Sequence, residues 1–164
     1  MATGARPALD VELMPLLGQA SYALMTELAV GLARLGITPR GHHVLLHALH
    51  GDLTQTELAG LCALDKTTMV VTLDELEKAG LAQRQLSGSD RRTRIVAVTE
   101  TGRQVLAEAQ EIVGQIYADV LSALPEGERE AFVQGLERLV GGRLAKPAKC
   151  ERPVRRRRMR QVVP

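Results

Sequence analysis

The two ends of this chain carry long stripes of apolar residues at helical spacing, and only short elements lie between them. Leucines recur every three or four positions over residues 10–35, which predicts one long amphipathic helix. A second long stripe follows Thr99, and a shorter one follows Pro125. Helices of this length cannot bury their apolar faces against so small a centre, so we expect a second copy of the chain to cover them.

The centre of the chain predicts three helices. The first covers residues 38–50 and begins with a threonine cap and a proline. Thr54 and Glu57 have the spacing of a capping box, which predicts that a short helix starts there. Asp65 is a good N-cap for the next helix, over residues 65–79, which a glycine ends.

A β-hairpin is predicted after these helices. Residues 81–86 and 93–98 favour extended structure, and residues 87–90 form a turn between them. The two short helices, joined over residues 62–64, make a helix-turn-helix, and the hairpin makes it winged. The expected fold is therefore mainly α with a small β-hairpin wing.

Composition and charge narrow the possible functions. Aromatic residues are only 2% of the chain, so the core must be aliphatic. The net charge of +2 conceals a tail over residues 143–164 with nine basic residues and one acid, on a body with twelve basic and eighteen acidic residues. We expect this tail to be disordered and to add affinity for nucleic acid without sequence preference; the alternative is a solvated tail that affects only solubility.

Several classes of protein are not expected. No apolar run reaches the ~18 residues that span a bilayer, and the N-terminus does not read as a secretory signal. A soluble, cytoplasmic protein without a membrane partner is the simplest interpretation. The sequence shows no glycine-rich phosphate loop and no Ser/His/Asp spacing, so we expect neither an enzyme nor a cofactor.

Three blocks of sequence carry a family resemblance: Asp65-Lys66-Thr67-Thr68, the run Leu73–Leu81, and Asp90-Arg91-Arg92 followed by Val98-Thr99-Glu100-Thr101-Gly102. With this pattern the chain resembles the MarR family of bacterial transcription regulators from about Leu9 to Leu139. The resemblance implies a homodimeric winged-helix repressor on a palindromic operator. It also implies release from DNA by small aromatic or phenolic ligands, by oxidants or, in some members, by zinc.

The resemblance and the element order together divide the chain into four parts. Residues 1–36 are expected to form an N-terminal dimerisation helix, and residues 37–99 the winged helix-turn-helix that binds double-stranded DNA. Residues 100–142 are expected to form C-terminal dimerisation helices. Residues 143–164 are the basic tail.

The first turn of the recognition helix is expected to contact DNA. Lys66 can reach phosphate or a guanine edge, and Thr67 and Thr68 can contact phosphate, base edges or a thymine methyl. Many relatives carry a polar pair where this chain has Val70-Val71, so specificity should depend on the first turn and the wing. The two valines either pack on thymine methyls or face the core.

The wing and the start of the preceding short helix complete the expected interface. Arg91, Arg92 and Arg94 suit a narrow minor groove, where the negative potential is enhanced. The resemblance gives Asp90 the role of orienting an arginine by an ion pair. The helix N-terminus at Thr54-Gln55 is well placed to bind phosphate.

The four histidines lie within nine residues, and they leave alternatives open. His42, His43 and His47 are expected to line an effector pocket beside Tyr22, where an imidazole can hydrogen-bond a phenolate or carboxylate. Because His43, His47 and His50 share one helical face, a metal site is an alternative, although an acid from the first helix or a second subunit would have to complete it. The histidines are otherwise surface or packing residues.

The two cysteines are not expected to act as sensors. Cys62 lies among small and apolar residues and is expected to be a buried thiol. Cys150 belongs to the basic tail, without an evident connection to the DNA-binding part.

The expected function is a ligand-responsive DNA-binding transcription regulator. One alternative is a zinc-responsive regulator of the same fold. The other is a non-specific architectural DNA-binding protein that relies on its tail.

Overall fold

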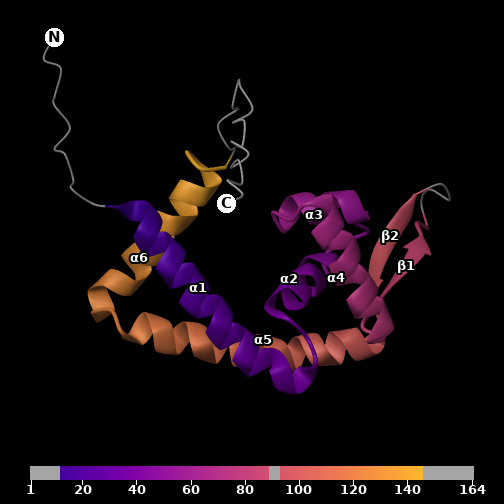
Figure 1. The fold of residues 1–164 in the computed structure, drawn as a ribbon, viewed down its shortest axis with the longest axis horizontal. Coiled ribbons are helices and arrows are strands. Elements are labelled where there is room, and N and C mark those ends of the chain that lie inside the picture. The colour runs from indigo at the N-terminus through magenta and orange to yellow at the C-terminus, as the bar shows by residue number, and fades with distance from the viewer. Residues whose placement is uncertain (1–11, 89–92, 146–164) are drawn as a thin grey trace, which may run out of the picture. The chain divides into compact units, whose positions relative to one another are not determined.

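The computed structural model describes residues 12–88 and 93–145. The chain forms two compact units, Met1–Val120 and Leu121–Pro164. The elements follow one another along the chain as drawn in Figure 1: α1 (Leu13–Leu32), η1 (Ala33–Leu35), α2 (Pro39–Ala48), α3 (Gln55–Leu61), α4 (Lys66–Lys78), β1 (Ala82–Leu86), β2 (Arg94–Val98), α5 (Glu100–Ser122) and α6 (Glu126–Gly141). The expected order of helices and strands is confirmed.

The helix starts are fixed by side-chain caps that the sequence predicts. The Thr38 hydroxyl accepts from Gly41 N at 3.0 Å at the start of α2, and the capping box at the start of α3 has both of its bonds. The Asp65 carboxylate accepts from an amide of the first turn of α4 at 2.9 Å. Each cap satisfies an amide that has no partner inside its own helix.

The hairpin is joined to the segment before α3. β1 and β2 are antiparallel, with a register that runs from Ala82 opposite Val98 to Leu86 opposite Arg94. In addition, Val96 N donates to Leu53 O at 2.9 Å, and Ile95 forms an isolated antiparallel β-bridge with Thr54. Side chains on both faces of β2 are buried, including adjacent Ile95 and Val96, so the strand does not show the simple alternation that its sequence indicates.

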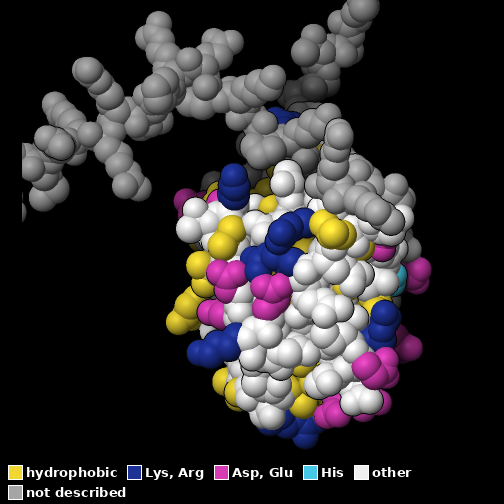
Figure 2. Space-filling view, turned by 90° about the vertical axis from the view of Figure 1, so that its right-hand side faces the viewer, with side chains coloured by type: hydrophobic (Ala, Val, Ile, Leu, Met, Phe, Trp, Pro, Cys, Tyr) yellow, Lys and Arg dark blue, Asp and Glu magenta, His cyan; other side chains and the backbone are white. Residues whose placement is uncertain are grey.

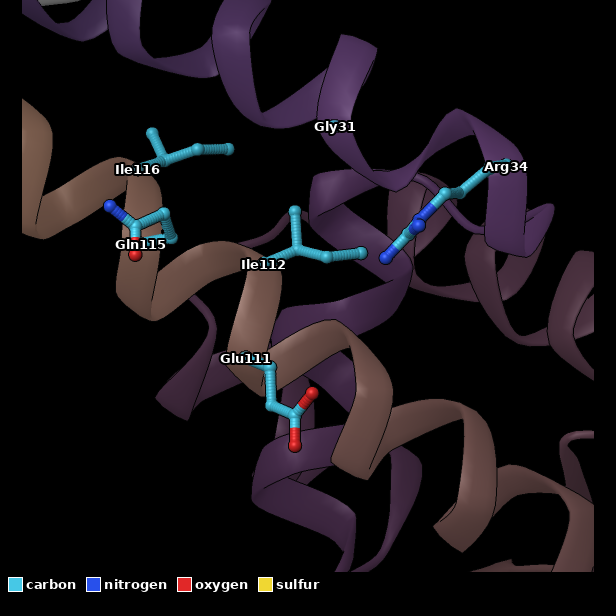
Figure 3. A pocket seen from close by; sticks show the side chains of 6 residues that line it. All are labelled: Gly31, Arg34, Glu111, Ile112, Gln115 and Ile116. Carbon is cyan, nitrogen blue, oxygen red and sulfur yellow. The ribbon is translucent and has the colours of Figure 1, made fainter.

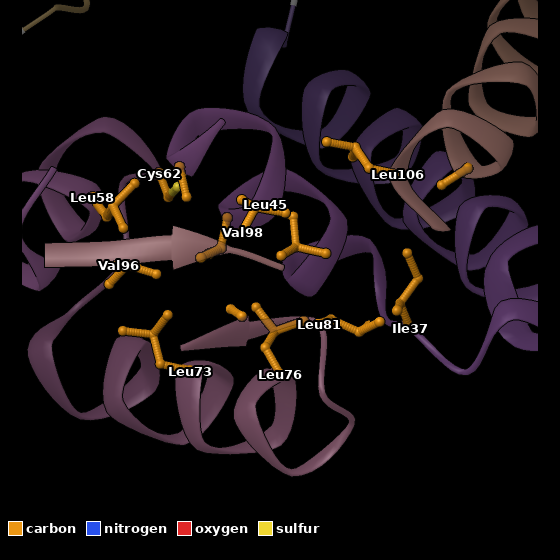
Figure 4. Packing of buried hydrophobic residues seen from close by; sticks show 14 of the residues in the cluster. Ile37, Leu45, Leu58, Cys62, Leu73, Leu76, Leu81, Val96, Val98 and Leu106 are labelled. Carbon is orange, nitrogen blue, oxygen red and sulfur yellow. The ribbon is translucent and has the colours of Figure 1, made fainter. Parts of the chain in front are cut away.

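The core of the first unit is aliphatic, as the composition requires. Figure 4 shows Leu73 and Leu76 from α4 facing Leu81 and Val96 across the centre of the cluster. The three aromatic residues, all in the described part of the chain, lie outside this core and are 44–78% exposed. Further core members that are fully or almost fully buried are Leu32, Leu45, Leu58, Met69 and Leu106.

The C-terminal part of α1 crosses α5 at a glycine. A Cβ atom on Gly31 would lie 2.9 Å from both Ile112 Cγ2 and Ile116 Cδ1. Figure 3 shows these two isoleucines pointing from α5 toward Gly31. The missing side chain therefore allows the two helices to approach closely.

Most of the apolar surface of α1 has no cover within the described part of this chain. Only Leu28 and Leu32 of α1 are buried. The segment Leu13–Leu35 has a mean hydropathy of 1.2 and only 11% of it is buried, so by length and composition it could cross a membrane. The expectation concerned an unbroken apolar run; polar residues interrupt this segment, and only its average hydropathy reaches the limit. The large apolar residues of α1 that are exposed are Leu13, Met14, Leu16, Leu17, Tyr22, Met25 and Val30.

The start of α5 is packed against the corner where α4 leads into β1. The Thr99 hydroxyl donates to Gly80 O at 2.7 Å, and Thr99 N donates to Leu81 O at 3.1 Å. A Cβ atom on Gly102 would lie 2.0 Å from Leu81 O and 2.9 Å from Val98 Cγ1. A glycine at position 102 is therefore needed for α5 to begin this close to the backbone.

This contact predicts that Gly102→Ala destabilises the protein. Because the added methyl group meets a backbone carbonyl, we expect a loss of about 2–3 kcal/mol in the free energy of unfolding. The measurement is urea unfolding at one protein concentration. The matched control is Gly60→Ala in α3, where an added Cβ has no neighbour within 4 Å. There we expect the free energy of unfolding to rise by up to about 1 kcal/mol, because alanine has the higher helix propensity. Equal midpoints for the two variants would contradict the close contact.

Candidate nucleic-acid interface and adjoining cavity

A tight turn between α3 and α4 presents the start of α4 at the surface. Ala63 has a left-handed backbone, with φ of 51°, and Leu64 N donates to Ala59 O at 2.9 Å across the turn. Lys66 and Thr67 follow, and both are exposed. The structure therefore leaves these two predicted contact residues accessible at the end of the helix that would enter the major groove.

Thr68, by contrast, is held by the cap of its own helix. Its hydroxyl donates to Asp65 Oδ2 at 2.6 Å, and its amide donates to Asp65 Oδ1 at 2.9 Å. These bonds, the hydroxyl bond first, lower the pKa of the Asp65 carboxyl. The Thr68 hydroxyl is thus already engaged, and its methyl group remains for contact with a base.

Thr54 and Gln55 also make bonds within the protein. The Thr54 hydroxyl accepts from Glu57 N at 3.2 Å and donates to Glu57 Oε2 at 2.8 Å. A bond from Thr54 N to the same carboxylate is the main cause that lowers the pKa of Glu57. Gln55 Oε1 accepts from Arg84 Nε at 3.4 Å, so the NH2 group of Gln55 is the side-chain donor here that can reach a phosphate.

The two valines in the middle of α4 lie in different surroundings. Val71 is 50% exposed, whereas Val70 is half-buried, and Thr72 and Leu73, which follow Val71, are buried. The alternative in which both valines face the core is therefore excluded. Val71 is available for apolar contact with a thymine methyl.

The wing is described only in part. Asp90, Arg91 and Arg92 lie outside the described residues. Arg94 is exposed at the first position of β2, opposite Leu86. Its position on the hairpin is consistent with the expected wing contact.

Arg84 on β1 is a residue that the sequence analysis missed. Its guanidinium pairs with Glu77 and, at 2.8 Å, with Asp74 Oδ1, both on α4. The backbone amide of Arg84 also donates to Glu77 Oε1 at 2.6 Å. With the bond to Gln55, this one side chain links the hairpin to the N-terminal end of α3 and to α4. The signal that could have found it is the combination of two acids three residues apart on α4 and an arginine in the middle of the following strand.

Charge on the hairpin side of the molecule is mixed. Figure 2 shows Lys and Arg side chains lying between Asp and Glu side chains, and the described residues form no continuous basic patch there. Lys66 is the first residue of α4.

A cavity of about 520 Å³ lies between α1, α2 and α5. His42 and His43 line it from α2, and Tyr117 lines it from α5. Tyr22 is not among its lining residues and is 78% exposed, so within one chain the structure does not bring Tyr22 to this cavity. Tyr117 takes that place because α5, not the first half of α1, passes the histidines. The other lining residues are Met25, Leu28, Leu32, Pro39, Leu46, Gln110, Val113 and Gly114.

His42 is a buried polar residue in the lining of this cavity. It is 9% exposed, and its Nε2 has no hydrogen-bond partner among the described residues. Burial, and then the nearby His43, lower the pKa of His42, so its imidazole is neutral at neutral pH. An unpaired nitrogen in an apolar cavity is a place where a ligand's polar atom would be stabilised.

His47 does not line the cavity and lies toward α3. Its Nε2 is 3.0 Å from His43 Nε2. Together with Cys62, these two residues form a group that could hold a metal ion, whereas His50 is not part of it.

The links made by Arg84 predict that Arg84→Ala weakens both the fold and DNA binding. We expect a loss of about 1–2 kcal/mol in the free energy of unfolding, because charge-assisted bonds to partly exposed carboxylates are lost. Arg84→Lys should recover less than half of this loss, since an ammonium group cannot reproduce the fork.

Urea unfolding and DNA affinity measure these two effects, and Arg103→Ala, an exposed position on α5, is the control. If Arg84→Lys behaves as wild type in both measurements, the three-way link has no energetic importance.

The chain matches a sequence model of the MarR family over residues 35–93. It is 30% identical to the transcriptional repressor CouR bound to a 23-mer DNA duplex, covering 79% of this chain and 92% of CouR, with a TM-score of 0.71.

Two ligand-bound structures are also similar. CouR from Rhodococcus jostii RHA1 bound to p-coumaroyl-CoA is 26% identical, over 89% of this chain and 100% of that chain, with a TM-score of 0.72. The Mycobacterium tuberculosis MarR family protein RV2887, in complex with p-aminosalicylic acid, is 28% identical to this chain. The match covers 80% of this chain and 100% of RV2887, with a TM-score of 0.67. The family is one of transcription regulators, which points away from an enzyme. With its winged helix-turn-helix and these similarities, the chain belongs to the MarR family of DNA-binding transcriptional regulators.

Proposed function

We propose that this protein is a repressor that binds a palindromic operator as a homodimer and is released by a small aromatic or phenolic compound. One observation supports this most directly. An accessible recognition-helix N-terminus and a cavity with an unpaired buried imidazole belong to the same unit and share α2 as a neighbour. A ligand in the cavity would therefore act on the element that supports the DNA-binding helices.

The proposed DNA contacts are divided between three places. Lys66 and Thr67 would reach base edges and phosphates from the start of α4, with Thr68 and Val71 offering methyl groups. The start of α3 would contact a phosphate with its amides and with the Gln55 side chain. Thr54 acts there chiefly by fixing the helix start. The wing arginines, Arg91, Arg92 and Arg94, would enter the minor groove, with Asp90 orienting one of them.

Dimerisation would be provided by the helices at the two ends of the chain. α1 exposes large apolar side chains over most of its length, and no residue of α6 is buried. A second copy that covers these helices would present two recognition helices to two half-sites one turn of DNA apart. We assign residues 1–36 and 100–142 to dimerisation, residues 37–99 to DNA binding and residues 143–164 to a basic tail that neutralises phosphates.

The proposed effector is a small aromatic compound with one polar end. The cavity volume of about 520 Å³ falls within the range of ligand sites, and its lining is mostly aliphatic. His42 would hydrogen-bond the polar end, and Tyr117 at 44% exposure would stack at the rim. The ligands of CouR and RV2887, an aromatic acyl thioester and an aromatic acid, support this class. The cytoplasm is the proposed location.

DNA binding is tested with a fragment that lies beside the protein's own gene, in competition with random DNA. We expect a clear preference for the fragment. Lys66→Ala should weaken binding and reduce the slope of log affinity against log salt by about 1, because one phosphate contact is lost. Lys78→Ala, at the opposite end of α4, is the matched control and should leave both unchanged. Equal binding to random DNA would favour the architectural alternative instead.

The effector site is tested by release from that fragment with p-aminosalicylic acid as the probe. His42→Ala should raise the concentration that releases half of the DNA by about tenfold, the value of one buried hydrogen bond. His50→Ala, an exposed residue outside the cavity lining, should release as wild type. Identical release by His42→Ala and wild type would exclude His42 from the effector site.

A further inference from the structure

We propose that His43, His47 and Cys62 bind a zinc-like divalent cation at the junction between α2 and the helix-turn-helix. The site adjoins the proposed effector cavity, with which it shares His43, and it requires no effector. The three side chains come from two elements: both histidines from α2 and the cysteine from the C-terminal cap of α3. Residues from one helix alone rarely enclose a metal, so the contribution of a second element distinguishes this group from a histidine stripe.

The positions of the ligand atoms suit a tetrahedral ion. His43 Nε2 and His47 Nε2 lie 3.0 Å apart, and one ligand atom of each residue lies within 4.8 Å of the others. Zinc bonds of ~2.0–2.1 Å to nitrogen and ~2.3 Å to sulfur place tetrahedral ligands roughly 3.3–3.6 Å apart. Small side-chain rotations would therefore bring all three atoms to bonding distance, and water would take the fourth position.

Without an ion, the group is poorly satisfied. Two imidazole nitrogens that face each other at 3.0 Å can share only one proton. Among the described residues, the Cys62 thiol has one long hydrogen bond, to the carbonyl oxygen of His43 at 4.0 Å. A cation that displaces the thiol proton would give both nitrogens and the sulfur a common partner.

The chemistry of these donors selects the kind of metal. Imidazole and thiolate prefer zinc and similar thiophilic ions, whereas magnesium and calcium require oxygen ligands. The sequence interpretation placed His50 in the third position because it shares a helical face with His43 and His47. In the structure, Cys62 rather than His50 lies beside these two histidines. Cys62 is only 6% exposed, so its sulfur is shielded from bulk solvent.

A bound ion would join α2 to the turn of the helix-turn-helix. Cys62 immediately precedes Ala63, the residue whose left-handed backbone makes the turn between α3 and α4. His43 also lines the effector cavity. Metal binding would therefore stiffen the turn from the side of α2, and it would raise the unfolding temperature by mass action.

The experiment is a titration of untagged, reduced, full-length protein with Co²⁺, which reports thiolate coordination by a charge-transfer band and tetrahedral geometry by its visible bands. We expect one cobalt per chain, displaced by Zn²⁺ and not by Mg²⁺. His43→Gln, His47→Gln and Cys62→Ala should each weaken binding by more than the ~10–100-fold that outer-shell changes cost. Cys62→Ala should also abolish the charge-transfer band.

Two controls keep the result specific. His50→Ala and Cys150→Ala should retain the spectrum, the stoichiometry and the affinity of wild type. Zn²⁺ should raise the unfolding temperature of wild type and of both controls. His43 is exposed, so His43→Gln will remain folded even if Cys62→Ala does not. Unchanged cobalt spectra in His43→Gln, loss of the band in Cys150→Ala, or no charge-transfer band in wild type would each overturn the proposal.

Discussion

The apolar face of α1 is the constraint on which the rest of this molecule depends. One chain buries only two residues of this helix, Leu28 and Leu32, and leaves large side chains such as Met14, Tyr22 and Val30 more than 70% exposed. An exposed apolar face of this kind marks a place where a partner or a membrane binds. A membrane or a second copy could cover it, and membership of a family of DNA-binding regulators favours the second copy.

The long helix α5 packs against α1 and, at its start, against the corner between α4 and β1. Its first turn is fixed to the corner between α4 and β1 by Thr99 and by the close approach of Gly102. About three to four turns after Gly102, Val113 and Tyr117 line the cavity between α1, α2 and α5. Because packed elements shift as rigid bodies, a ligand that moved α5 at the cavity would also move the hairpin and α4 at the other end. This is a physical route by which a small molecule could alter DNA affinity.

Local rules predicted most of the fold. Caps at Thr54 and Asp65 depend on residues three positions apart, so the sequence alone identified them. The aliphatic core followed from the scarcity of aromatic residues. The bridge from Ile95 to the segment before α3 could not be predicted, because it joins residues far apart in the chain and leaves no local pattern.

The candidate site was predicted less completely, for the same reason. Lys66 and Thr67 were identified from their place after a helix cap. The role of Arg84 required knowing that β1 returns beside α4, and the choice of Tyr117 over Tyr22 required knowing how α5 crosses the histidines. Cys62 was correctly expected to be buried, but its closeness to His43 and His47 depends on the packing of α3 against α2.

Sedimentation equilibrium of the purified full-length protein in detergent-free buffer is the most direct test of the central claim, that two copies cover α1 and form the regulator. The account predicts a soluble species with twice the chain mass of 17.8 kDa, at concentrations where it binds DNA. A monomer that remains soluble and binds its operator would contradict it, as would a protein that stays in solution only with detergent.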